Sequence, residues 1–253
     1  MESPLATCSR GSVQQGLSAA GGALGFYPLG LAADKRYSLD VMKNIETLQA
    51  PNATDDVVVV AFDMCSSSKI LEDLTRTNSL NQFDRLLKNL QLWLAANAKT
   101  NGYVLYKFTG DGWILLFPVG ELTGMALMAF LLKLCEKHQK FRGDIVDSHL
   151  ESTPEAIGIT IGIDFGPVKL VKFATGDIEF VGRSINVACR LQTAVKDKTP
   201  GPDYRCLMSR KVYNALMKDV TEFQFGPANR VLRNISGGKR YHCYKVDFTK
   251  SMK

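Results

Sequence analysis

Several signatures that assign a chain quickly to a class of protein are missing from this sequence. The six cysteines form no Cys-x-x-Cys pair and no tight cluster, which argues against a zinc site and against a disulfide framework. Reduced thiols in the cytoplasm are the simplest interpretation. The basic residues never occur in a run of five or more, so no nucleic-acid-binding arm is expected. No segment offers the ~20 predominantly apolar residues of a membrane-spanning helix.

The composition is that of an ordinary globular protein. The chain has 253 residues, of which 45% are hydrophobic and 22% charged, and this length favours one large domain with a short extension. The net charge of +6 suits a polyanionic ligand such as a triphosphate, although it is just as common in proteins that bind no polyanion. The glycine-rich stretch 16–33 contains Pro28 and mostly small apolar residues, so we expect a soluble, cytoplasmic protein without a membrane segment.

Two parts are expected along the chain. Residues 1–50 form an N-terminal extension whose first part is rich in Gly, Ala and Ser. This extension contains one predicted helix, over 33–49, because its apolar residues recur there at a spacing of three. Pro51 and Asn52 then separate the extension from the main domain, residues 51–253.

The main domain alternates strand and helix patterns. Residues 56–62 (DVVVVAF) are a continuous β-branched run, typical of a strand buried on both faces, and serines 66–68 are expected to cap the next helix. Residues 109–112 predict a hairpin and 166–167 a turn. The other expected elements are helices over 83–99, 122–140, 184–194 and 209–218, strands over 103–108, 113–117, 156–163, 168–173 and 178–181, and a hairpin turning at 237–238. This order predicts a ferredoxin-like α+β fold, with an antiparallel-rich sheet covered by helices.

Two aspartates occupy positions suited to metal ions. Asp63 ends the buried strand and Asp111 lies at the tip of the following hairpin, and in a ferredoxin-like sheet both can reach one edge. Mg²⁺ prefers oxygen ligands, usually one or two protein carboxylates together with substrate phosphates. Two such ions can activate an attacking hydroxyl and stabilise a leaving oxygen. Either aspartate alone is better explained by helix capping or turn chemistry.

The local sequence around both aspartates resembles a known enzyme family. The segments VVVVAFDMCSSSKILEDL and YKFTGDGWILLF are similar to the two metal-binding segments of class III adenylate and guanylate cyclases. The resemblance implies that Asp63 and Asp111 bind two Mg²⁺ or Mn²⁺ ions and that the Met64 carbonyl completes one metal's shell. The diguanylate cyclases share this fold, but their GGDEF-type hairpin is absent because the turn here reads TGDGW.

A third segment carries the same resemblance. IGITIGIDFGPV followed by IEFVGRSINVACRLQ looks like the family's strand and its asparagine–arginine helix, and residues four apart project from one helix face. By resemblance, Asn186 orients the ribose and Arg190 stabilises the transition state at the α-phosphate, a task suited to a planar and permanently charged guanidinium. The family's triphosphate-binding lysine is displaced in NISGGKRYHCY, so Lys239 or Arg240 takes that role.

Two further positions select the base in this family. Lys107, four residues before Asp111, is a hydrogen-bond donor, and Glu179 is an acceptor. Because guanylate cyclases carry Glu at the first position, the resemblance makes Lys107 an argument against guanine. The donor and acceptor fit adenine, cytosine and uracil equally well, so hydrogen bonding alone leaves the base open.

Departures from the usual family pattern indicate a particular branch. Arg183 follows a glycine where ordinary members carry Asp or Asn, and DMCSSSKILEDL and GDGWILLFP also differ from the common forms. These variants are similar to the pyrimidine cyclases of bacterial Pycsar antiphage systems, which are short domains without sensor modules. That resemblance implies cyclic UMP or cyclic CMP made from UTP or CTP, with a cyclic-nucleotide-activated effector as partner. An adenylate cyclase making cyclic AMP is the alternative.

The family resemblance also implies a head-to-tail homodimer with shared active sites. The metal-binding aspartates of one chain face the base-, ribose- and phosphate-binding residues of the other, which predicts two complete sites. A second alternative is a nucleotide-binding regulatory module without catalysis. Degenerate cyclase domains of that kind lose a metal aspartate or the arginine, and this chain keeps both. Nucleic-acid binding is suggested only by the positive charge, and no sequence motif supports it.

Overall fold

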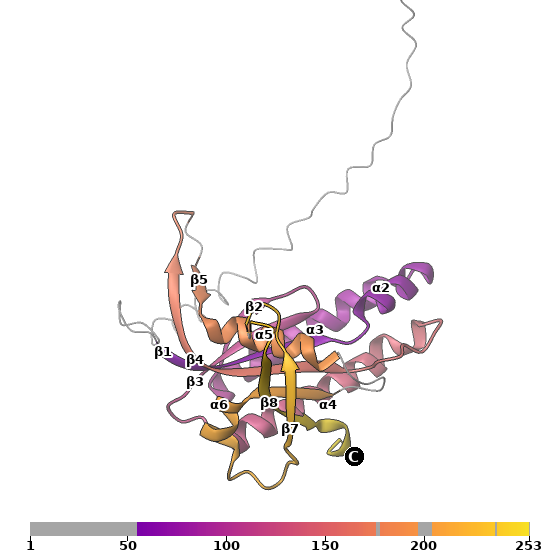
Figure 1. Cartoon of the computed structure of the whole chain (residues 1–253). Helices are drawn as coiled ribbons and strands as arrows, with labels where there is room; N and C mark the ends of the chain where they lie inside the picture. The colour runs from indigo at the N-terminus through magenta and orange to yellow at the C-terminus, as the bar shows by residue number, and fades with distance from the viewer. Residues whose placement is uncertain (1–54, 176–177, 197–203, 236, 253) are drawn as a thin grey trace, which may run out of the picture. The chain divides into compact units, whose positions relative to one another are not determined.

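The computed structural model describes residues 55–175, 178–196, 204–235 and 237–252. The helix expected over 33–49 lies outside the described residues. The described part is an α+β fold in which helices cover both faces of a sheet (Figure 1). No helix within these ranges combines the length and the apolar character needed to cross a membrane.

Strands and helices alternate along the chain. The strands are β1 (Asp55–Met64), β2 (Val104–Phe108), β3 (Gly112–Pro118), β4 (Ile159–Lys172), β5 (Ile178–Val181), β6 (Arg205–Ser209), β7 (Gly226–Val231) and β8 (Arg240–Asp247). The α-helices are α2 (Ser67–Arg76), α3 (Asn81–Asn101), α4 (Gly124–Ile145), α5 (Arg183–Val195) and α6 (Arg210–Val212). A π-helical turn, η3 (Tyr213–Met217), continues α6, and two short 3-10 turns are η1 (Asp147–His149) and η4 (Phe248–Lys250).

Strand β1 lies inside the sheet, between β3 and β4. The strand order is β2-β3-β1-β4-β6-β8-β7, and β5 pairs with β4. Neighbouring strands are antiparallel except β4 and β6, which run parallel. The consecutive valines from Val57 to Val60 have no exposed surface, as expected for a β-branched run that is covered on both faces. The predicted buried strand is therefore confirmed.

Helices α5 and α4 cover opposite faces of the sheet around β1. One apolar cluster joins β1 to α5 through Val57, Val59, Ala61 and Ala188. On the other face, the ring of Phe117 in β3 packs against Phe130 of α4, with centroids 5.6 Å apart. Helix α5 lies so close to β4 that a Cβ at Gly162 would be 2.0 Å from the Ala188 carbonyl oxygen. Glycine at this position is what allows the close contact between helix and sheet.

Both predicted hairpins are confirmed. Strands β2 and β3 pair antiparallel around residues 109–111. Strands β7 and β8 do the same near the C-terminal end, and the turn between them contains Gly237 and Gly238. Both glycines have positive φ angles, 56° and 78°, a conformation that glycine adopts without steric cost.

The turn expected at Gly166-Pro167 is wrong, because both residues lie inside the continuous strand β4. They pair with Val57 and Asp56 of β1. On its other side β4 pairs with β6 only through residues 160–163, and with β5 only through residues 169–172. The missing N–H of Pro167 falls between these two pairings, where a proline is tolerated in a strand.

Strand β6 is not predicted by the sequence pattern. It is short, and its residues Cys206, Leu207 and Met208 are buried by the parallel pairing with β4 and the antiparallel pairing with β8. Periodicity cannot assign so short an apolar run. The helix expected over 209–218 is present in part, because Ser209 caps α6 through a bond from the Val212 N–H and the helix becomes π-helical at Tyr213.

A buried histidine makes the stability of this fold depend on pH. His138 of α4 is 1% exposed, and its Nδ1 lies 3.1 Å from the Tyr204 hydroxyl. Burial, together with the positive charge of Arg142, lowers the pKa of His138 to about 3. The folded protein therefore keeps this imidazole neutral at pH values at which the unfolded chain, with an ordinary pKa of 6.5, takes up a proton.

We expect the contribution of His138 to stability to be complete above its unfolded pKa and to be lost as the pH falls below it. By about pH 5 the loss is about 2 kcal/mol. His138→Gln removes the titrating group and so should flatten this part of the pH dependence, measured by chemical denaturation. His149→Gln, which changes a histidine that is only partly buried, serves as the control and should keep the wild-type slope. An unchanged slope in His138→Gln would contradict the prediction.

Candidate active site

The predicted metal ligands Asp63 and Asp111 meet at one edge of the sheet. Asp63 pairs with Gly112 of β3, so the turn that carries Asp111 lies directly beside the end of β1. The Met64 N–H donates to the Asp111 carbonyl oxygen at 3.3 Å, and the Asp111 carboxyl group, when it is protonated, donates a hydrogen bond to Asp63. A Cβ at Gly112 would be 1.9 Å from the Phe62 carbonyl oxygen. A residue without a side chain is therefore needed where the hairpin approaches β1.

The shared environment moves the pKa values of the two carboxyl groups apart. Burial, together with the hydrogen bond to Asp63, raises the pKa of Asp111 to about 6. Burial also acts to raise the pKa of Asp63, but hydrogen bonds from Asp111, Lys196 and Gln192 outweigh it and lower the net value. Near neutral pH both groups are mainly ionised, and their negative charges lie side by side. A divalent cation with a preference for oxygen ligands fits such a pair.

Helix α5 and the residue that follows it supply two further groups to Asp63, which the sequence did not identify. The Lys196 ammonium lies 2.7 Å from Asp63 Oδ2. The Gln192 amide donates to the same oxygen at 3.3 Å and to the Thr160 hydroxyl at 2.6 Å. Gln192 and Lys196 are four residues apart, the spacing that puts two side chains on one helix face. That spacing is the signal by which the sequence could have identified them.

A serine expected to cap a helix contacts the second aspartate instead. Capping of α2 by residues 66–68 is not observed, because the cap residue is Ser66 and its side chain makes no cap hydrogen bond. Ser66 has a φ of 55°, whereas a capping serine normally has an extended backbone. The neighbouring Ser67 hydroxyl donates to Asp111 Oδ2, so this segment helps to orient a candidate metal ligand.

The structure also brings together the two residues predicted to contact the base. Lys107 of β2 and Glu179 of β5 form an ion pair with Nζ and Oε1 2.7 Å apart. Hydrogen bonds from Lys107 and from Tyr106 lower the pKa of Glu179. Glu179 is therefore an ionised acceptor beside a charged donor. Tyr106 is a further member of this group that the sequence analysis did not identify.

The remaining predicted residues are not brought to the two aspartates within one chain. Asn186 and Arg190 are exposed on α5, and their side chains have no hydrogen bond or ion pair among the described residues. Lys239 is exposed in the turn before β8. Strand pairing connects the C-terminal end of β8, through β6 and β4, to the end of β1 that carries Asp63. Lys239 precedes the N-terminal end of β8, so it lies on the side of the sheet where the opposite strand ends are found.

Comparisons with known proteins give a match in structure. No protein-family model matches the sequence, and no curated protein is similar enough in sequence to be matched. The solved adenylyl cyclase CyaB from P. aeruginosa is 18% identical, with a TM-score of 0.60 over 77% of this chain and 94% of that one. This fold is that of a class III cyclase catalytic domain. The catalytic core of a rhodopsin-guanylyl cyclase with converted specificity, in complex with ATPαS, is 23% identical, with a TM-score of 0.56 over 77% and 96%.

A guanylate cyclase domain from Catenaria anguillulae, in complex with GTP, has the same fold. It is 21% identical, with a TM-score of 0.53 over 76% of this chain and 96% of that one. The expected ferredoxin-like α+β fold of class III cyclases is thus confirmed. At this level of identity the comparison establishes the fold, and the roles of individual residues remain predictions.

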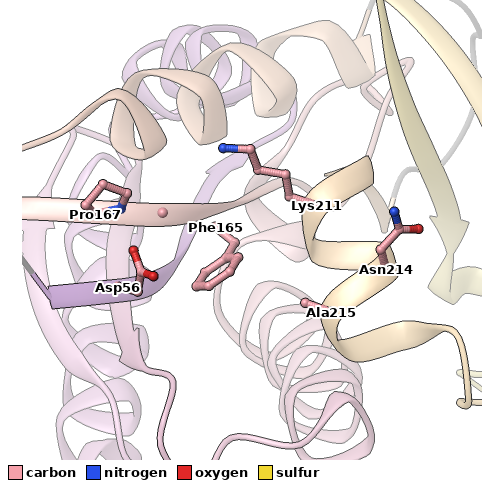
Figure 2. A pocket seen from close by; sticks show the side chains of 7 residues that line it. Asp56, Phe165, Pro167, Lys211, Asn214 and Ala215 are labelled. Carbon is pink, nitrogen blue, oxygen red and sulfur yellow. The ribbon is translucent and has the colours of Figure 1, made fainter.

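A pocket of about 510 Å³ lies away from the two aspartates of this cyclase fold. It opens at the start of β1, beside Asp56, whereas Asp63 stands near the other end of the same strand. Figure 2 shows Phe165 and Pro167 of β4 on one side of it, and Lys211 and Asn214 on the other. None of the predicted site residues lines this pocket.

We expect one substitution in the carboxyl pair, Asp111→Asn, to raise the stability of the metal-free protein and to weaken metal binding. A raised pKa means that the stabilising contribution of Asp111 is complete below its ordinary pKa of 3.8 and is lost as the pH rises through about 6. Asp111→Asn removes the repulsion and leaves an amide that can donate to Asp63. We expect a metal-free melting temperature higher by roughly 2–4 °C near pH 7, a gain that disappears in acid.

Thermal unfolding with and without millimolar Mn²⁺ tests this prediction. Mn²⁺ should raise the melting temperature of the wild type and have little effect on Asp111→Asn. The control Asp84→Asn changes an exposed aspartate on α3 and should respond to Mn²⁺ like the wild type. A metal-free Asp111→Asn variant that melts below the wild type, or that keeps the full Mn²⁺ response, would refute the assignment.

Proposed function

We propose that this chain is a nucleotidyl cyclase, which converts a nucleoside triphosphate to the 3′,5′-cyclic monophosphate and pyrophosphate. The observation that carries the proposal is the contact between Asp63 and Asp111 at one edge of a class III cyclase fold. Two adjacent carboxylates whose pKa values are moved apart are typical of a functional site rather than of a turn. The ion pair between Lys107 and Glu179 adds a donor and an acceptor suited to a nucleobase.

Two Mg²⁺ or Mn²⁺ ions fit the proposed site. Asp63 and Asp111 would hold them, with the Met64 carbonyl as a further oxygen ligand, and few protein carboxylates are needed when substrate phosphates complete the shells. The ions would supply activation of the attacking hydroxyl and neutralisation of the phosphate charge. Lys196, 2.7 Å from Asp63, balances part of the negative charge of the free protein.

The reaction is an intramolecular displacement at the α-phosphorus. The 3′-oxygen of the substrate forms a bond to that phosphorus in line with the leaving group. The bond from the α-phosphorus to the bridging oxygen breaks, and pyrophosphate and one proton leave. Arg190 stabilises the charge on the α-phosphate oxygens because its guanidinium stays protonated and can contact two oxygens at once. Asn186 orients the ribose, and Lys239 holds the triphosphate.

The active form is proposed to be a head-to-tail homodimer. In one chain Gln192 of α5 and Lys196, which follows the helix, contact Asp63, while Asn186 and Arg190 of the same helix are exposed. One helix thus presents its phosphate-binding residues away from its own aspartates. A partner chain that supplies its own aspartates to this exposed face completes the site, and two-fold symmetry then gives two such sites.

The proposed substrates are UTP or CTP, and the proposed role is synthesis of a cyclic pyrimidine nucleotide that activates an effector in bacterial antiphage defence. Arg183 and the metal-binding segment DMCSSSKILEDL, which resemble those of the pyrimidine cyclases, support this reading. Adenylate cyclase activity is the alternative. It is supported by the Lys107–Glu179 pair, which fits adenine as well, and by the similarity in fold to an adenylyl cyclase.

The first test is to incubate the purified protein with ATP, GTP, CTP and UTP separately in the presence of Mn²⁺ and to identify products by mass. We expect cyclic UMP or cyclic CMP from the wild type and no cyclic product from Asp63→Ala. Cyclic AMP alone would establish the alternative substrate. A wild type that binds these nucleotides but forms no cyclic product would instead be a regulatory module, and activity retained by Asp63→Ala would refute the metal site.

Mixing two inactive variants tests the shared site. In a heterodimer of Asp63→Ala and Arg190→Ala chains, one site carries both changes and the other carries neither. With free exchange at equal concentrations, half of the dimers are mixed, and activity should recover to about a quarter of the wild-type value. A mixture of Asp63→Ala with Asp111→Ala leaves every site defective and should stay inactive. No recovery in the first mixture would show that each site is built within one chain.

A further inference from the structure

Strand β2 contains an irregularity beside the proposed base-binding pair. Leu105 pairs with Leu115 of β3, but Lys107 pairs with the next residue, Ile114, so Tyr106 is an extra residue in the strand. Such a bulge re-aims the side chains around it. In a regular strand, consecutive side chains point to opposite faces. Here Tyr106 and Lys107 both reach the same carboxylate, that of Glu179.

The Tyr106 hydroxyl links the backbone of β5 to Glu179. The Phe180 N–H donates to the hydroxyl oxygen at 2.9 Å, and the hydroxyl proton is donated to Glu179 Oε2. The Phe180 carbonyl oxygen, 3.0 Å away, competes for that proton, but an ionised carboxylate is the stronger acceptor. The Tyr106 ring also packs edge-on against the ring of Phe180, with centroids 5.2 Å apart. Ring and hydroxyl are thus both fixed in place.

The two oxygens of Glu179 therefore have different partners. Oε1 accepts from Lys107 at 2.7 Å, and Oε2 accepts from Tyr106. Lys107 has a long, flexible side chain, and when a nucleotide binds it must also donate a hydrogen bond to the base. Tyr106 makes no contact with the base in this proposal. It can hold the plane of the carboxylate while Glu179 accepts a hydrogen bond from the base through a remaining lone pair.

We propose that Tyr106 is a positioning residue for base selection: its hydroxyl orients the Glu179 carboxylate so that the site discriminates among nucleobases. This inference rests on the proposed function, because it gives Glu179 a base to recognise. The bulge in β2 is then the feature that brings Tyr106 and Lys107 to one acceptor. A purely structural role, in which Tyr106 only attaches β5 to the sheet, would affect stability and leave base selection unchanged.

The test compares the four nucleobases rather than activity alone. Dissociation constants of the 3′-deoxy forms of ATP, GTP, CTP and UTP, which cannot cyclise, are measured by calorimetry for the wild type and for Tyr106→Phe. Removal of a hydrogen bond to a charged group should weaken binding of the preferred base by about tenfold. Binding of the nucleotide with the least favoured base should stay unchanged. The ratio of the two dissociation constants should therefore also fall by about tenfold. In Tyr106→Phe/Glu179→Gln the two effects should not add, because both residues act on the same contact.

Tyr103→Phe is the matched control. Tyr103 precedes β2 by one position, is 2% exposed and donates its hydroxyl proton to the Leu94 carbonyl oxygen at 2.6 Å. This variant should lose stability but keep the wild-type ratio of affinities. An unchanged ratio in Tyr106→Phe, an equal loss in Tyr103→Phe, or a wild type that binds all four bases alike would overturn the inference while leaving the cyclase proposal intact. A wild type that binds none of the four would refute both.

Discussion

The proposed site depends on two carboxyl groups that the fold holds side by side. Asp63 and Asp111 come together because β3 pairs with β1 up to the last residues of that strand, and because Gly112 allows the hairpin to lie against the Phe62 carbonyl. Burial, the hydrogen bond to Asp63 and, to a smaller extent, the charge of Asp63 raise the pKa of Asp111 to about 6. The rigid, fully buried valines of β1 hold the arrangement in place, since a strand paired on both sides cannot move to relieve it.

Helix α5 connects the two halves of the proposed site. Gln192 near its C-terminal end and Lys196 directly after it contact Asp63, while Asn186 and Arg190 remain exposed. The helix can do both because it lies on the sheet at the distance that Gly162 allows. A displacement of α5 would therefore change both the charge balance at the aspartates and the position of Asn186 and Arg190, the residues proposed to contact the ribose and the α-phosphate.

Much of the fold follows from local patterns. The β-branched run at 56–62 predicts a strand buried on both faces, and the glycines at 110, 112, 237 and 238 mark two hairpins that the structure confirms. The errors occur where pairing overrides local signals. Pro167 continues β4 because no pairing needs its N–H, and β6 is short enough that its pairing with β4 and β8 defines it as a strand.

The sequence by itself determined which chemical groups are available, since the two aspartates, the pair proposed to contact the base and the helix that carries Arg190 can all be named from motifs along the chain. It also determined the class of fold, because the hydrophobic patterns of strands and helices can be recognised over a few neighbouring residues, and their order along the chain predicts the fold. Only the tertiary structure decided which groups meet. The contacts of Lys196 with Asp63 and of Tyr106 with Glu179 join residues 133 and 73 positions apart. Such contacts depend on sheet register, helix position and a single bulge, which arise when distant segments pack together.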